Sequence, residues 1–147
     1  NVNDLPAASG NRYAEALQSS RGAYAVIKAD NPDLVLVGNG SEVATLVAAN
    51  ELLKAKGVTA QVVSIPSIGV FMNQPKEYRD EVIPEDAPTF GLTAGLPSTL
   101  YRVVGARGKV FGLDHFGSSA PYKVLEEKFG FTPELVVKEI ESYLKNV

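Results

Sequence analysis

The feature that most constrains the fold is an apolar run at residues 34–37, which contains only Leu and Val and stops at the turn formed by residues 38–40. A strand without alternating polar residues is typical of a sheet covered by helices on both faces. Directly after the turn, Leu46, Ala49 and Leu53 recur at helical spacing, which predicts a helix over residues 41–56. A buried strand that leads into an amphipathic helix is the repeating unit of an α/β domain.

The same alternation continues along the chain. Apolar, partly β-branched runs predict further strands, over residues 23–27, 58–64, 89–93 and 109–113. Helical spacing and Pro at helix starts predict further helices, over residues 74–83, 97–104 and 121–129 and from residue 132 onwards. Only a tight turn joins the strand at 23–27 to that at 34–37, so we expect these two to pair antiparallel. The sequence therefore predicts an α/β domain with a five-stranded, largely parallel sheet and helices on both faces.

Composition excludes several function classes. The 147 residues include no Cys and one His, so disulfides, Cys-ligated metals and thiol catalysis are excluded and His-based metal sites are hard to build. A net charge of -3 argues against a nucleic-acid partner, and the lack of an 18-residue apolar run argues against a membrane partner. We expect a soluble, cytoplasmic protein, with residues 1–21 as a linker or tail before a domain over 22–147. Because the chain starts with Asn rather than Met, we also expect it to be part of a longer protein.

Ligands in open α/β sheets bind beyond the carboxyl ends of the parallel strands, here the loops at 38–42, 64–75 and 114–121. The first loop leads into a helix N-terminus, where free N–H groups attract anions. Gly40, Ser41 and Glu42 are therefore candidates for an anion or regulatory site. The alternative is a tight turn with Ser41 as N-cap, and it is favoured because Val43 stands where a dinucleotide-binding motif needs its third Gly.

The third loop contains His115, the only His of the chain, next to Asp114 and close to two serines. A Ser/His/Asp triad is disfavoured, because adjacent residues usually point apart and no G-x-S-x-G motif occurs. We interpret His115 as a hydrogen-bonded surface residue, with a ligand or subunit contact as the alternative. The charged run 77–81 is interpreted as a solvated helix face. The residues alone thus indicate a ligand-binding edge without a complete catalytic site.

Several blocks of the sequence, taken together and in order, resemble the C-terminal domain of transketolase. These blocks are residues 31–37, 40–43, 62–67, 74–79, 116–121 and 129–133. The most specific are Ser-Glu-Val at 41–43, Gln-Pro-Lys-Glu-Tyr-Arg at 74–79 and Phe-Gly-Ser-Ser-Ala-Pro at 116–121. The resemblance implies a three-layer α/β/α sandwich whose five-stranded, mostly parallel sheet has an antiparallel first strand.

The resemblance also implies a function. Transketolases transfer a two-carbon ketol unit between sugar phosphates in the pentose phosphate pathway of carbohydrate metabolism. They act as homodimers with thiamine diphosphate and a divalent cation, Mg or Ca. The C-terminal domain supplies no cofactor or metal contact, so we expect no catalytic, cofactor-binding or metal-binding residue in this chain. Its expected partners are the two N-terminal domains of the parent enzyme, the second subunit and the sugar-phosphate substrates.

One position departs from the family pattern. Transketolases commonly carry Arg-Gln-Asn-Leu-Pro just before this domain, with the Arg on the substrate phosphate, and aligning on Leu5 and Pro6 puts Val2 in place of that Arg. Substrate preference therefore stays open. Two alternatives for function also stay open: the C-terminal domain of another thiamine diphosphate enzyme, such as a 2-oxoacid dehydrogenase β-subunit, and an anion-binding regulatory module that uses residues 38–42.

Overall fold

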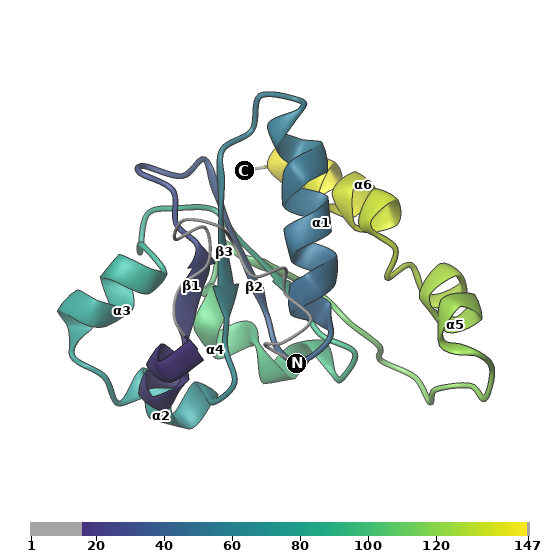
Figure 1. Cartoon of the computed structure of the whole chain (residues 1–147), viewed down its shortest axis with the longest axis horizontal. Coiled ribbons are helices and arrows are strands. Elements are labelled where there is room, and N and C mark those ends of the chain that lie inside the picture. The colour runs from purple at the N-terminus through teal and green to yellow at the C-terminus, as the bar shows by residue number, and fades with distance from the viewer. Residues whose placement is uncertain (1–15, 147) are drawn as a thin grey trace.

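Five strands form one sheet in the order β1-β3-β2-β4-β5 in the computed structural model, which describes residues 16–146 (Figure 1). The strands are β1 Tyr24–Ile27, β2 Leu34–Gly38, β3 Ala60–Ser64, β4 Thr89–Leu92 and β5 Lys109–Phe111. All neighbouring pairs are parallel except β1 with β3. The prediction of a five-stranded sheet whose first strand is antiparallel is confirmed.

The neighbour predicted for β1 is wrong. β1 does not pair with β2 but with β3, with Tyr24 opposite Ser64, because β2 is occupied on both sides by its parallel neighbours β3 and β4. The connection over residues 28–33 is long enough to carry the chain across β3. There the backbone N–H of Ala29 donates to Gln61 Oε1 at 3.2 Å. The short connection after β1 was therefore sufficient to predict the direction of β1 but not which strand lies beside it.

Helices cover both faces of the sheet (Figure 1). On one face lie α1 Glu42–Lys54 and α6 Pro133–Leu144; on the other lie α2 Ile68–Met72, α3 Lys76–Val82, the 3-10 turn η3 Pro97–Thr99 and α4 Tyr101–Val104. The remaining helix, α5 Tyr122–Phe129, precedes α6 in the chain. The sequence predicted each of these helical regions except α2, which lies in the predicted loop 64–75. Within residues 16–146, no helix has the length and apolar character needed to cross a bilayer.

The region predicted as a linker is partly helical. Ala16–Arg21 form a 3-10 helix, η2, and the backbone N–H of Gly22 donates to Ser19 O at 3.0 Å. The rest of the predicted linker, residues 1–15, lies outside the described residues.

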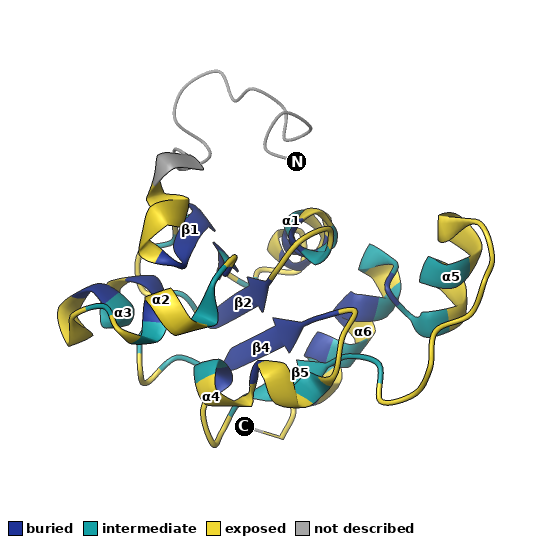
Figure 2. Ribbon diagram, turned by 90° about the horizontal axis from the view of Figure 1, so that it is seen from below, coloured by how far each residue is buried: buried dark blue, intermediate teal, exposed yellow. Residues whose placement is uncertain are grey.

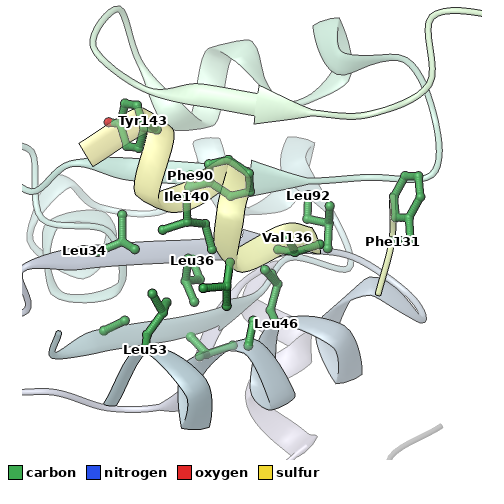
Figure 3. Packing of buried hydrophobic residues seen from close by; sticks show 14 residues of the cluster. Leu34, Leu36, Leu46, Leu53, Phe90, Leu92, Phe131, Val136, Ile140 and Tyr143 are labelled. Atoms are coloured by element: carbon green, nitrogen blue, oxygen red, sulfur yellow. The ribbon is translucent and has the colours of Figure 1, made fainter. Parts of the chain in front are cut away.

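The larger core cluster fills the space between the sheet and the pair α1 and α6 (Figure 3). Leu36 and Phe90 from the sheet are fully buried against Leu46 and Ile140. The ring of Phe90 lies 6.3 Å from that of Tyr143. This half of the core is mainly aliphatic and holds α6 on the sheet.

Tyr78 anchors α3 on the opposite face. Its hydroxyl donates to Ala23 O at 2.7 Å, and the guanidinium of Arg21 stacks 3.2 Å above the ring. Only 7% of Tyr78 is exposed. The interpretation of residues 77–81 as a solvated face is therefore wrong at Tyr78, because a short helix on a sheet must direct one side inward.

We expect replacement of Tyr78 to change stability at alkaline pH. Burial raises the pKa of Tyr78 above its ordinary value of 10.0. The folded state thus favours the neutral phenol, so this contribution is full below pH 10 and is lost as the pH rises through the folded-state pKa. Between pH 8 and pH 11, the free energy of unfolding should fall less steeply in Tyr78→Phe than in the wild type, as measured by urea unfolding. Tyr101→Phe removes an exposed hydroxyl and serves as the control; identical slopes for all three proteins would contradict the prediction.

Candidate functional site

The carboxyl ends of the parallel strands meet at one edge of the sheet, and a cavity of about 500 Å³ lies there between α1 and α5. Its lining comes from the start of α1, the loops after β4 and β5, and α5: Ser41, Glu42, Thr45, Ala94, Leu113, Gly117, Ser118, Tyr122, Leu125, Glu126, Phe129 and Phe131. Two of the three predicted loops thus come together. The third, at 64–75, does not line the cavity, and the loop after β4 was missed although β4 is also a parallel strand.

Ser41 is the N-cap residue of α1, as predicted, but its side chain makes no cap hydrogen bond. Its backbone is already helical, with φ -65° and ψ -28°, and its hydroxyl donates to Glu42 Oε1 at 2.8 Å. A side-chain N-cap requires extended backbone, from which the oxygen reaches the N–H groups of the first turn. Gly40 supplies the turn before the helix with φ +61° and does not line the cavity.

His115 lies beside the cavity but not in its lining. It is exposed, its Nδ1 is 2.9 Å from Phe116 O, and its ring lies 5.3 Å from that of Phe129. Ser118 Oγ accepts a hydrogen bond from Lys128 Nζ at 2.8 Å. His115 is therefore a hydrogen-bonded surface residue, and none of the contacts of the described residues links it to a serine hydroxyl.

The charge of the cavity bears on the anion hypothesis. Its two ionisable acids are Glu42 and Glu126, and Glu42 occupies the first turn of α1, where its carboxylate compensates the helix dipole. An anion would meet two like charges on otherwise largely apolar walls. The arrangement suits an apolar occupant better, and the anion role of Gly40, Ser41, Glu42 and His115 stays a prediction.

A projecting arm forms the outer wall of the cavity (Figure 1). It consists of residues 114–129, the loop after β5 and α5, and no residue of α5 is buried (Figure 2). Phe116 is 99% exposed, Tyr122 66% and Val124 52%. Leu96, in the loop after β4, is also exposed, and none of these four apolar side chains is covered by the rest of the described chain.

The groups available for catalysis or metal binding at this edge of the sheet are few. Within residues 16–146, no group of three His, Asp or Glu side chains is placed to hold a metal ion. The cavity combines apolar walls, two carboxylates and two serine hydroxyls. Such a surface can bind a partner. Its described hydroxyl–carboxylate contact joins the adjacent residues Ser41 and Glu42, and no His lines the cavity.

The comparison with known families decides the identity of the fold. The family model for the transketolase-like TK C-terminal domain matches residues 22–132. This chain belongs to that family. The transketolase of Mycobacterium leprae is 39% identical over 133 residues, which are 86% of this chain and 19% of the relative. The transketolase of Halalkalibacterium halodurans is 42% identical over 130 residues, again 86% of this chain and 19% of the relative.

A solved structure agrees. The transketolase from Leishmania mexicana superposes with a TM-score of 0.81 at 33% identity and covers 90% of this chain and 19% of that chain. The identification as the C-terminal domain of a transketolase and the predicted α/β fold are thereby confirmed. The chain spans about a fifth of the length of the curated relatives it matches.

Proposed function

We propose that this transketolase C-terminal domain supports, without performing, the transfer of a two-carbon ketol unit between sugar phosphates in a thiamine diphosphate-dependent parent enzyme. The observation that carries the proposal is the match of residues 22–132 to this domain family, within relatives about five times as long. The parent enzyme would be a cytoplasmic homodimer of the pentose phosphate pathway. Thiamine diphosphate and Mg or Ca would be held by its other domains.

The projecting arm is the surface through which we propose that the domain contacts the rest of the parent enzyme. A phenylalanine that is 99% exposed gains nothing from the hydrophobic effect in this domain alone. The exposed Tyr122 and Val124 and the cavity behind them provide a pocket and a rim of the kind that interfaces use. Sugar-phosphate substrates would be bound outside this chain. The position of Val2, which bears on substrate preference, lies outside the described residues.

The 147-residue chain alone is expected to be inactive and to bind no cofactor. Titration calorimetry with thiamine diphosphate in the presence of Mg²⁺, and separately of Ca²⁺, should give no saturable heat at micromolar concentrations. A coupled assay with a ketose phosphate donor and an aldose phosphate acceptor should give no turnover. Intact transketolase 1 of Escherichia coli, a relative 41% identical to this chain over 128 residues, is the positive control for both measurements. Micromolar cofactor binding by the chain alone would overturn the proposal.

A further inference from the structure

A second cavity, of about 560 Å³, lies at the opposite edge of the sheet, where the chain enters β4 and β5. Its walls come from the end of α2, from α3 and residues 83–89, and from α4 and the loop 105–108. The cavity shares no residue with the one beside α5. Its volume is in the range of small-molecule sites.

The charges in this second cavity do not balance. Lys76 Nζ lies 2.7 Å from Asp80 Oδ2 and 2.8 Å from Glu85 Oε2, so these acids are occupied by Lys76. Three arginines also line the cavity, Arg79, Arg102 and Arg107, and within residues 16–146 none of them forms an ion pair. Asp86 is the remaining acid of the lining. Counted together, the four basic and three acidic residues of the lining leave the cavity with a net charge of +1, in a chain of net charge -3.

Arg79 adds an unsatisfied donor. Its Nε is buried and has no hydrogen-bond partner among the described residues. Buried polar groups in proteins nearly always have a partner, so the orphaned N–H of this arginine indicates an acceptor outside the described residues. The planar guanidinium fork matches the oxygen atoms of a phosphate in a bidentate arrangement.

We propose that this second cavity binds a phosphate group, either as inorganic phosphate or as the phosphate monoester of a small metabolite, through Arg79, Arg102 and Arg107. A phosphate monoester is an anion with three strong acceptor oxygens, as many as there are guanidinium groups in the lining. A carboxylate has only two oxygens, which is fewer than the three guanidinium groups. The inference does not rest on the proposed function, because only residues of this chain carry it and they lie at the other edge of the sheet.

The test is a titration of the ¹⁵N-labelled 147-residue chain at constant ionic strength, followed by NMR. The probes are inorganic phosphate, ribose 5-phosphate and ribose. We expect saturable shifts of the Gly105 and Gly108 amides with one or both phosphate probes and none with ribose. Tighter binding of ribose 5-phosphate assigns the site to a phosphate monoester, and equal or tighter binding of inorganic phosphate assigns it to the free ion.

Variants locate the binding site. Arg102 and Arg107 are exposed, so the double variant Arg102→Gln/Arg107→Gln should keep the fold and weaken phosphate binding at least tenfold. Arg79→Lys keeps the charge but removes the fork and should also weaken binding. Lys138→Gln removes an exposed charge from α6, on the opposite face, and should leave the affinity unchanged. Two results would overturn the proposal. One is the absence of saturable shifts up to 20 mM of either phosphate probe, because a site with a millimolar Kd binds about 2 kcal/mol more tightly than that limit. The other is equal affinity of the wild type and the double variant for the phosphate probes.

Discussion

Gly22→Ala is expected to lower the free energy of unfolding by about 3–5 kcal/mol, because a methyl group there fits neither the backbone angle nor the space. Gly22 has φ +89°, in the left-handed region that disfavours a side chain. An added Cβ would collide with the backbone N of Phe71 and lie 2.6 Å from Ser67 O. Ser67 is the N-cap of α2 and Phe71 lies within that helix. These two contacts cannot be relieved by a side-chain rotation, since the obstructing atoms are backbone.

The matched control is Gly57→Ala. Gly57 has φ +81°, close to that of Gly22, but no atom lies within 4 Å of its added Cβ. Gly57→Ala should therefore lower the free energy of unfolding only through the unfavourable backbone conformation, by about 1–2 kcal/mol. Thermal unfolding should show a decrease in Tm of roughly 10–15 °C for Gly22→Ala and a few degrees for Gly57→Ala. Equal decreases would show that the close packing of Gly22 against α2 contributes nothing.

The same contact explains why α2 could not be predicted. Ile68–Met72 is a five-residue helix with one buried side chain, Phe71, so it offers no periodic pattern to detect. It is held from outside: the backbone N–H of Ser67 donates to Gly22 O at 3.0 Å, across more than 40 residues of sequence. By contrast, α1 could be predicted because three of its buried residues recur at helical spacing.

The order of the strands in the sheet also could not be predicted from the sequence. The apolar run of β2 predicts burial on both faces, and the structure leaves none of its five residues exposed. Which strand lies beside it depends on tertiary packing. The short link between β1 and β2 suggested a hairpin, but parallel crossovers through helices placed β3 and β4 on both sides of β2.

Of the two candidate sites, one could be predicted from the sequence and the other could not. The convergence of the loops at 38–42 and 114–121 follows from the rule that parallel strands end at one edge, so the sequence was sufficient to predict it. The arginine-lined cavity was not predicted. Arg79 and Arg107 are 28 positions apart, on a helix and in a loop, and single basic residues in such places look like ordinary solvated charges. Only the structure shows that they share a cavity.

Phe90→Ala is expected to lower the free energy of unfolding by about 3–5 kcal/mol, the usual cost of truncating a buried aromatic residue. Phe90 is fully buried in β4 beneath α6, so its removal leaves a void among Leu36, Ile140 and Tyr143 (Figure 3). Tyr143 also receives a hydrogen bond at its Oη from the Thr89 backbone N–H, at 3.1 Å, and donates one to Arg107 O at 2.8 Å. A shift of its ring into the void would therefore disturb the loop 105–108 at the second cavity.

Phe116→Ala is the control for the same change of side chain. With 99% of Phe116 exposed, truncation removes almost no buried area, so the free energy of unfolding should stay within about 0.5 kcal/mol of the wild type. Urea unfolding of both variants at one pH gives the comparison. A cost of 3 kcal/mol or more at Phe90 and none at Phe116 would separate the two roles that these phenylalanines have: one holds α6 on the sheet, and the other is available to the rest of the parent enzyme. Loss of stability at Phe116 comparable to that at Phe90 would show that the projecting arm packs on its own domain, and the proposed contact surface would then have to be abandoned.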